Sequence, residues 1–342
     1  MKKIIALAAL LIFIFESCST DFELTTDWKD ITIVYGLLDK DANYNYIRIE
    51  KAFLDKEISA LTLAQNADSL YYDSLTVQLL EYDNGSLLNT TTLEKVDGDN
   101  ISATKDSGIF AQSPNILYRT DHAINQNYHY QLLITKPDDQ SMVSAETNVI
   151  NDFSLQKPIG TQKINFFPGG NYTFEWKSAT DGKIYDLLFR FHYKEYDNTT
   201  GTLVKDTVLN WQLFRNKTSG STAGGEDMGY IIESDNFYNF LSNSIADNQD
   251  VYRVAGKVDL IFSVGGEEFY NYYLVNQAQT GLTQGQSLQQ YTNINPGYGI
   301  FSSRMSKTFV DKDLTSSTID SLSCMSLTSH LNFLRANGTP CQ

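Results

Sequence analysis

The fold is decided by two stretches in the second half of the chain, Tyr172–Trp176 (YTFEW) and Ile184–Tyr196 (IYDLLFRFHYKEY). Apolar and polar residues alternate in both, which is the pattern of a β-strand with one buried face. In the longer stretch the apolar face is formed by Tyr185, Leu187, Phe189, Phe191 and Tyr193. Only a short polar turn separates the two strands. The alternating pattern of both predicts a mainly β chain.

The same alternation continues on both sides of these stretches. Turn residues separate the segments, and Asn84-Gly85 is the strongest signal because this pair favours the tight turn of a β-hairpin. Several short strands separated by turns are typical of a β-sandwich. Further strands are predicted at 31–38, 44–50, 75–82, 128–134, 143–149, 203–214, 254–264 and 300–310.

Three segments of the second half have helical rather than strand periodicity. Apolar residues three or four positions apart predict helices at 235–245, preceded by Ser234 as the N-cap, at 267–277 and at 326–335. A length of 342 residues favours two domains. The strand ending in Trp176 and the long Tyr-rich strand after it resemble fibronectin type III and related immunoglobulin-like sandwiches.

The fold class predicted from these patterns is two immunoglobulin-like β-sandwich domains. The first comprises residues 31–150, and the second comprises residues 151–342 and carries the inserted short α-helices. With 42% hydrophobic residues the chain has enough apolar material for packed cores, which excludes wholesale disorder.

The charge balance excludes one class of partner. The chain has 26 Lys and Arg against 41 Asp and Glu, a formal net charge of −15. Binding to nucleic acid needs a surplus of Lys and Arg on one face, so no nucleic-acid partner is predicted.

Residues 1–17 are predicted to be a signal peptide rather than part of the fold. Two lysines precede an apolar run from Ile4 to Phe15, which is too short to cross a bilayer but has the length of a signal-peptide core. Ser17 directly before Cys18 resembles the lipobox of bacterial lipoproteins, in which the cysteine is lipidated and becomes the mature N-terminus. Residues 18–30 would then form a polar tether. The alternative is a secreted protein cleaved near Ser17.

Lipidation of Cys18 leaves Cys324 and Cys341 as an even pair of cysteines. In an oxidising compartment a disulfide between them is expected, and it would close a small loop around the C-terminal segment. Two unpaired thiols are the alternative, because the sequence does not give the geometry that a disulfide requires.

Three segments share a pattern of apolar positions and turns that extends over nearly the whole chain after the signal peptide. They are Val34–Leu38 (VYGLL), the hairpin at 128–149, and Tyr291–Phe301 (YTNINPGYGIF). Together they resemble a family of uncharacterised outer-membrane lipoproteins of Bacteroidetes. Genes of this family commonly lie beside those of TonB-dependent receptors. The resemblance therefore implies a lipid-anchored outer-membrane protein that assists such a receptor, with no known enzymatic activity.

Motifs that indicate catalysis or a cofactor are missing from the sequence. It contains no zinc-type pair of histidines, no nucleophile elbow and no glycine-rich phosphate loop. Paired carboxylates are plentiful, as expected of an acidic surface. The protein is therefore predicted not to be an enzyme and to hold no cofactor. A hydrolase with an unrecognised site in its loops is the least favoured alternative.

The turn after the first strand contains one weak metal candidate. Asp39, Asp41 and Asn43 offer the oxygen ligands that calcium prefers, and Glu50 follows at the position of a twelfth ligand. However, Tyr44 stands where a calcium loop of the EF-hand type needs glycine, and the flanks are strands rather than helices. An ordinary hairpin turn is the preferred interpretation, and no metal site is predicted.

Aromatic residues give the remaining functional signal. The chain has 21 Tyr, 19 Phe and 3 Trp, and Tyr binds sugars and peptides because its ring has an apolar face and a polar tip. Tyr291 and Tyr298 are the candidate ligand-binding residues, although β-sandwich cores also use aromatic side chains.

The function predicted from these observations is a non-enzymatic accessory or ligand-binding module of a TonB-dependent receptor system. A lipid on Cys18 would hold it at the periplasmic or cell-surface face of the outer membrane, and its ligand would be a glycan or a peptide. The alternative is a surface glycan-binding lipoprotein that works without a receptor.

Overall fold

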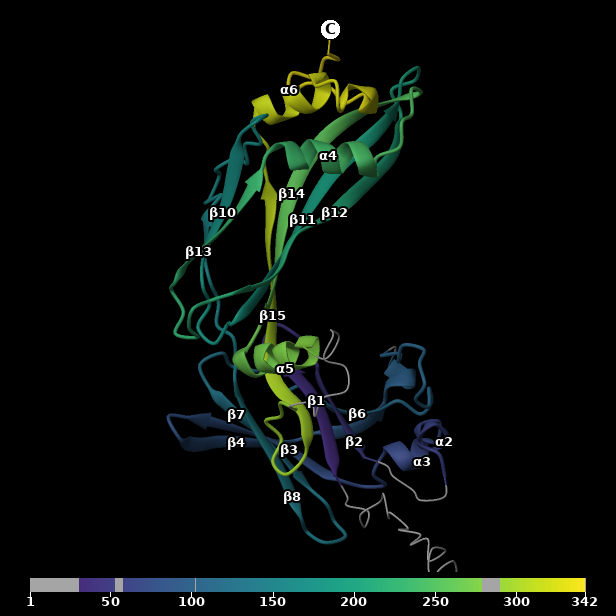
Figure 1. Ribbon diagram of the computed structural model, residues 1–342, viewed down its shortest axis with the longest axis vertical. Coiled ribbons are helices and arrows are strands. Elements are labelled where there is room, and N and C mark those ends of the chain that lie inside the picture. The colour runs from purple at the N-terminus through teal and green to yellow at the C-terminus, as the bar shows by residue number, and fades with distance from the viewer. Residues whose placement is uncertain (1–30, 53–57, 102, 279–289, 342) are drawn as a thin grey trace, which may run out of the picture.

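The computed structural model describes residues 31–52, 58–101, 103–278 and 290–341. They form a mainly β protein with packed sheets and a few short helices, so the prediction of a mainly β fold with short helices is confirmed. Figure 1 shows an elongated molecule in which β15 (Tyr298–Lys312) runs through the middle. The predicted signal peptide, Cys18 and the tether lie outside the described residues.

The strands of the first half of the chain enclose one hydrophobic core. One four-stranded sheet has the order β4-β3-β7-β8, and part of an eight-stranded sheet covers the other side. The core includes Val34, Ile47, Leu79 and Leu132, which come from both sheets. The elements are β1 (Thr32–Leu38), β2 (Asn45–Lys51), α2 (Ala60–Ala64), α3 (Ala67–Leu70), β3 (Thr76–Asp83), β4 (Ser86–Thr92), β5 (Glu94–Asp97), η1 (Gly98–Ile101), β6 (Ile116–Thr120), β7 (His129–Thr135) and β8 (Met142–Asn148).

A second core fills the other half, and it is rich in aromatic side chains. The two stretches that predict the fold form β10 and β11 and supply Trp176, Phe189 and Phe191, all fully buried. Phe237 from α4 packs against both phenylalanines. The elements are β9 (Leu155–Lys157), β10 (Asn171–Lys177), β11 (Ile184–Asp197), β12 (Leu203–Thr218), β13 (Asp227–Glu233), α4 (Asp235–Ser244), β14 (Val251–Gly265), α5 (Glu267–Ala278), β15, α6 (Ser316–Cys324) and η2 (Ser329–Leu331).

Strand β15 belongs to both cores. Residues 298–303 pair in parallel with β1, and residues 304–312 pair with β14 in the antiparallel direction. This gives one sheet of eight strands in the order β12-β11-β14-β15-β1-β2-β6-β5. On the same face of β15, Phe301 enters the first core and Met305 enters the second. The division of the chain near residue 150 stays a prediction, and residues 294–303 pack with the half that precedes it.

Close contact between β1 and β15 requires glycine at position 299. Gly299 has a φ of 105°, which side chains rarely tolerate. A Cβ at this position would lie 2.0 Å from the carbonyl oxygen of Val34. The glycine therefore allows β15 to begin its pairing with β1 immediately after the turn at 295–297.

The C-terminal segment differs from the sequence prediction. Leucine spacing predicts a helix at 326–335, whereas the structure has α6 at Ser316–Cys324 and only a short 3-10 turn after it. The chain reverses at Asn332, which has a φ of 55°. It then pairs with Arg253 of β14 through two backbone hydrogen bonds, at 2.9 Å to Asn332 and at 2.8 Å from Leu334. These tertiary hydrogen bonds replace those of the predicted helix.

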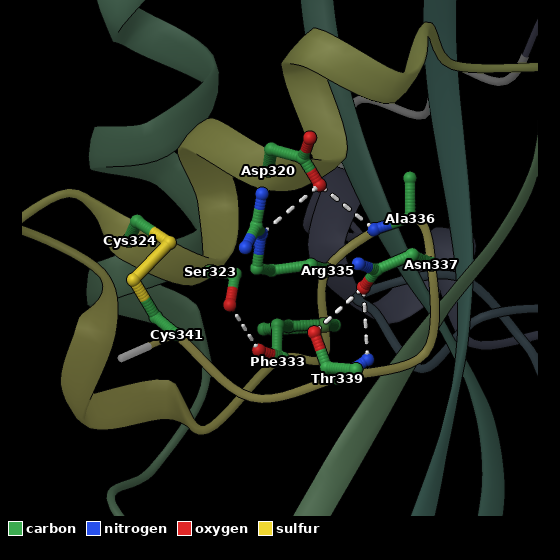
Figure 2. The surroundings of a disulfide bond; sticks show 9 residues. All are labelled: Asp320, Ser323, Cys324, Phe333, Arg335, Ala336, Asn337, Thr339 and Cys341. Carbon is green, nitrogen blue, oxygen red and sulfur yellow. Dashed lines mark hydrogen bonds and ion pairs between the residues drawn. A yellow bond between two sulfur atoms is a disulfide. The ribbon is translucent and has the colours of Figure 1, made fainter.

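A disulfide and a buried arginine hold this segment in place. Cys324 at the end of α6 is bonded to Cys341, with a Cα–Cα distance of 5.3 Å (Figure 2). The Arg253 side chain is 2% exposed, and its Nε lies 2.8 Å from a carboxylate oxygen of Glu195. Its Nη1 donates to the carbonyl of Leu331 at 2.7 Å. The segment is thus fastened at both ends.

Removing the disulfide should lower the stability of the protein measurably. The two cysteines are 17 residues apart, and closing a loop of that size contributes about 3 kcal/mol to the free energy of unfolding. We expect the double variant Cys324→Ser, Cys341→Ser to lose about that much in urea denaturation. Reductant should destabilise the wild type but not the double variant. Equal stability of the wild type with and without reductant would contradict the prediction.

Candidate functional site

The candidate site is a cavity of about 410 Å³ beside α5, here called the tyrosine pocket. Helix α5 lies across β15 near the middle of the molecule (Figure 1). The cavity is lined by Ile33, Tyr35, Tyr272, Val275, Asn276, Gln290, Tyr291, Tyr298 and Gly299. Four of these nine residues are tyrosines, and they come from β1, α5 and the chain on both sides of the turn before β15.

The secondary structure explains why these side chains meet. On β1, Val34 and Leu38 point into the first core, so the intervening positions Ile33 and Tyr35 face the opposite side of the sheet. The parallel register places Tyr298 beside Ile33. On α5, residues 272, 275 and 276 have the spacing of one helical face. One sheet face and one helix face therefore form the two walls.

The tyrosine rings are available to a ligand. Tyr35 and Tyr298 are 40% and 43% exposed. The Tyr35 and Tyr272 rings meet edge to face, with centroids 6.4 Å apart. Asn276 and Gln290 add amide groups to the wall. Apolar faces combined with a few polar groups are the usual chemistry of a small-ligand pocket.

Burial raises the pKa of two of the phenols. Burial, assisted by hydrogen bonding to Tyr272, raises the pKa of Tyr35. Burial also raises the pKa of Tyr291, against the opposing effect of a hydrogen bond with Asn271. Both hydroxyl groups are neutral at physiological pH, as tyrosine is at its ordinary pKa of about 10, and a neutral hydroxyl can donate a hydrogen bond to a ligand.

The two tyrosines predicted from the sequence, Tyr291 and Tyr298, lie in the same pocket. Sequence reasoning did not select Tyr35 and Tyr272, which complete it. Tyr35 lies within the VYGLL strand and Tyr272 within the cluster at 270–273, so each could be interpreted as a core residue. Only the packing of α5 on the sheet brings them to the site.

At the first turn of α5, a carboxylate is half-buried next to the pocket. Glu268 accepts hydrogen bonds from Ser302 of β15 at 3.2 Å and from Thr147 of β8 at 3.3 Å. Burial raises the pKa of Glu268 in spite of these hydrogen bonds. Burial likewise raises the pKa of Asp181, to which Asn148 donates a hydrogen bond. Glu268 thus joins α5 to β8 and β15 at an electrostatic cost.

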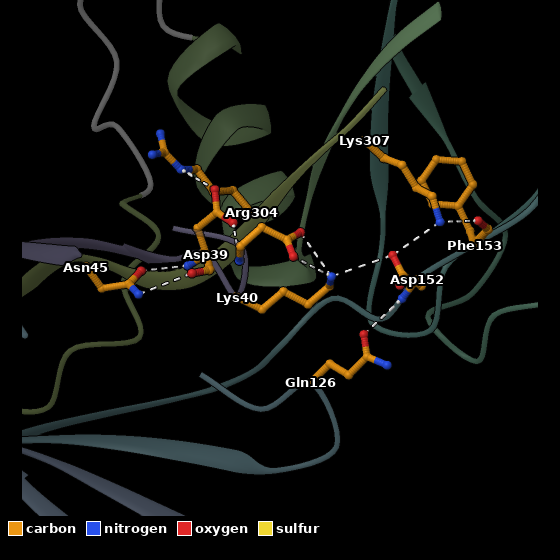
Figure 3. A network of polar contacts seen from close by, with 9 residues as sticks. Asp39, Lys40, Asn45, Gln126, Asp152, Phe153, Arg304 and Lys307 are labelled. Atoms are coloured by element: carbon orange, nitrogen blue, oxygen red, sulfur yellow. Dashed lines mark hydrogen bonds and ion pairs between the residues drawn. The ribbon is translucent and has the colours of Figure 1, made fainter. Parts of the chain in front are cut away.

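The weak calcium candidate lies in a network of ion pairs that joins the two halves of the chain. Lys40 Nζ lies 2.9 Å from a carboxylate oxygen of Asp41 and 3.6 Å from one of Asp152, which Lys307 also contacts (Figure 3). Arg304 lies 3.5 Å from Asp39. Asp39 and Asp41 therefore face cationic side chains already, while no hydrogen bond is seen for Asn43 within the described part of the chain. The calcium interpretation stays a weak hypothesis.

Burial acts to raise the pKa of Asp152, but the hydrogen bond from Lys307 and the charges of Lys307 and Lys40 outweigh it. The net pKa of Asp152 is lowered, so this carboxylate is ionised at neutral pH. The network accordingly supports the junction at neutral pH and weakens in acid.

Other polar clusters of the described residues have no arrangement typical of catalysis. His122 contacts Glu81 at 2.6 Å, His192 contacts Asp259 at 2.8 Å, and His129 contacts Asn148 at 2.9 Å. In the described ranges, none of these three rings is seen to hydrogen-bond to a serine, threonine or cysteine side chain. Nor do those ranges contain three or more His, Cys, Asp or Glu side chains placed to hold a metal ion.

Comparisons with known proteins identify no relative of the chain. No protein-family model matches the chain, and no curated protein has a matching sequence. Within the described residues, no helix combines the length and the apolar character needed to cross a membrane.

Replacing Glu268 by Gln should change how stability depends on pH. Because the pKa of Glu268 lies above its ordinary value of 4.5, the folded protein keeps this proton where the unfolded chain has lost it. The ionised carboxylate therefore destabilises the folded state increasingly as the pH rises above about 4.5. We expect Glu268→Gln to be at least as stable as the wild type at pH 7, with an advantage that shrinks toward pH 4.5.

The matched control for this measurement is Glu267→Gln. Glu267 is an exposed carboxylate on the same turn and carries the same charge, but it contacts neither Thr147 nor Ser302. The Glu267→Gln variant should leave the pH dependence of the stability measured by urea denaturation nearly unchanged. A Glu268→Gln variant that is less stable than the wild type by the same amount at every pH would contradict the assignment.

Proposed function

We propose that this protein is a lipid-anchored outer-membrane protein that binds a ligand for a TonB-dependent receptor and catalyses no reaction. In this proposal the tyrosine pocket holds the ligand, and a lipid on Cys18 holds the protein at the membrane. The ligand is a glycan or a peptide, because both present apolar faces to aromatic rings and polar groups to amides and hydroxyls.

The observation that carries the proposal is the convergence of four tyrosines on one cavity. Three separate parts of the chain supply them, and two of the four rings are about 40% exposed. Side chains that served only to fill a core would be buried. Exposed rings around a concave surface with amide groups are typical of binding sites rather than of packing.

The membrane and receptor parts of the proposal are supported by the sequence alone. A basic start, a short apolar run and the Ser17-Cys18 pair resemble a lipoprotein signal. The VYGLL strand and the Tyr291–Phe301 segment resemble lipoproteins encoded beside TonB-dependent receptors. These two segments pair with each other as β1 and β15 and form one wall of the pocket. The part of the sequence that suggests the partner is therefore also part of the proposed site.

A surface glycan-binding lipoprotein that works without a receptor is the second candidate function. The number of tyrosines in the pocket favours it, because sugar rings stack on aromatic rings. It differs from the first proposal only in what receives the ligand. Covalent cross-linking in intact cells, followed by purification, distinguishes the two. Recovery of a large β-barrel protein supports the receptor proposal, and its repeated absence while glycan binding persists supports the second candidate.

Truncating a pocket tyrosine should weaken ligand binding. A ring contact is worth about 0.5–1.5 kcal/mol beyond burial of its area, so we expect Tyr298→Ala and Tyr35→Ala to weaken binding up to about tenfold each. Affinity electrophoresis against a panel of polysaccharides, and titration with peptides, measure this effect.

The matched control for these variants is Tyr44→Ala. Tyr44 is 44% exposed, nearly the same as Tyr298, but it lies outside the pocket and packs against Tyr46 and Arg119. The Tyr44→Ala variant should bind the ligand as tightly as the wild type does. Equal losses in all three variants, or none in the pocket variants, would contradict the assignment of the site.

Replacing Cys18 by Ala should release the protein from membranes. Lipidation needs the thiol of this residue, and no basic patch is required when a lipid provides attachment. Cell fractionation measures the result, with the Cys341→Ser variant as the control that keeps Cys18. Continued membrane retention of Cys18→Ala would rule out lipid anchoring at this position.

A further inference from the structure

A second cavity, of about 660 Å³, lies on the other side of α5 and is here called the arginine cavity. Phe269 and Tyr273 of α5 line it, whereas Tyr272, Val275 and Asn276 line the tyrosine pocket. The helix therefore separates the two cavities. The remaining lining residues are Leu37, Asp39, Ile184, Asp186, Arg215, Asn216, Ser263, Val264, Gly265, Arg304, Met305 and Ser306.

One side of the arginine cavity is apolar. Ile184 is almost fully buried and Leu37 is half-buried, and both line the cavity, whereas the side chains of Val264 and Met305 belong to the second core. Gly265 allows Phe269 to pack tightly here, because a Cβ at position 265 would lie 2.5 Å from the Phe269 ring. The result is a wall suited to an aromatic or aliphatic group.

Two guanidinium groups also line the cavity, Arg215 of β12 and Arg304 of β15. Arg215 is exposed, and its side chain makes no ion pair or hydrogen bond with any other part of the chain that the structure describes. The Arg304 side chain is 61% exposed, and only its Nε approaches a carboxylate, that of Asp39 at 3.5 Å. Most of the donors of both arginines are thus open to the cavity or to solvent. The chain as a whole has a net charge of −15. Two arginines with open donors at one cavity therefore contrast with the acidic composition of the chain.

The carboxylates at the cavity already have other partners. Asp186 accepts a hydrogen bond from the backbone N–H of Asn216 at 2.8 Å. Asp39 accepts one from the backbone N–H of Asp41 at 3.1 Å and faces Arg304 with its other oxygen. Neither carboxylate contacts Arg215. Asn216 also donates to the hydroxyl of Tyr273, which holds the Arg215 segment against α5.

We propose that the arginine cavity binds a small carboxylate with an apolar body. The carboxylate lies at Arg215 and Arg304, whose planar guanidinium groups match its geometry. The apolar body lies against Phe269, Ile184 and Leu37. This site is separate from the tyrosine pocket and does not depend on the function proposed for that pocket.

The test is a ligand-observed NMR titration of the full chain with 2-naphthoate and with 2-naphthamide, its neutral counterpart of similar size. We expect 2-naphthoate to bind at least about tenfold more tightly, because only the carboxylate makes charge-assisted hydrogen bonds. Arg215→Gln and Arg304→Gln should each weaken the binding of 2-naphthoate by a similar factor and change the binding of 2-naphthamide little. Equal affinities for the two probes would overturn the proposal.

Three further variants locate the binding. Ser263→Trp fills the cavity from an exposed position and should abolish binding of both probes. Arg190→Gln removes an arginine that is hydrogen-bonded to Asn210 outside the cavity, and it should bind like the wild type. Tyr298→Ala should also leave 2-naphthoate binding unchanged. Loss of 2-naphthoate binding in Arg190→Gln or Tyr298→Ala, or its persistence in Ser263→Trp, would place the carboxylate elsewhere and overturn the proposal.

Discussion

The arrangement of the whole molecule depends on the hydrogen bonding of β15. This strand pairs in parallel with β1 over residues 298–303 and then with β14 over residues 304–312. Because a strand alternates its side chains, one face of β15 supplies Phe301 to the first core and Met305 to the second. A change in the register of β15 by one residue would reverse both sets of side chains at once. The two cores are therefore linked by backbone hydrogen bonds and not by side-chain contacts alone.

The same strand determines where α5 can lie. The helix follows β14 after Gly266, and the chain must return to the start of β15, so α5 is held over the outer face of the β1–β15 pair. That face is polar where it meets the helix, with Ser302 and Glu268 in contact. Burial of Glu268 is unfavourable for an ionised group, which is consistent with a helix placed for a role besides packing. The tyrosine pocket and the arginine cavity lie on the two sides of this helix.

The polar network around Asp152 adds local support at the same level of the molecule. Lys40 and Lys307 both approach its carboxylate, so groups from the two halves share one partner. Exposed ion pairs contribute about 0–1 kcal/mol each, so these contacts restrict the junction rather than create it. Binding sites commonly occur where two packed units meet, because each unit supplies a wall that is already rigid. Both cavities have walls from the sheet and from α5. The tyrosine-rich lining of one and the arginines of the other suit different ligands.

The sequence by itself determined the mainly β fold, the Asn84-Gly85 hairpin and two of the three predicted helices, because alternation and helical spacing are local properties. It also selected Tyr291 and Tyr298. Tertiary structure decided which face of β1 is buried. Alternation shows that Tyr35 and Val34 point to opposite sides, but only the packed sheets show that Val34 enters the core and Tyr35 enters the pocket. Tertiary hydrogen bonds with Arg253 also overrode the helix predicted at 326–335. Contacts between residues far apart in the chain depend on register and packing, and these are set by the whole fold rather than by neighbouring residues.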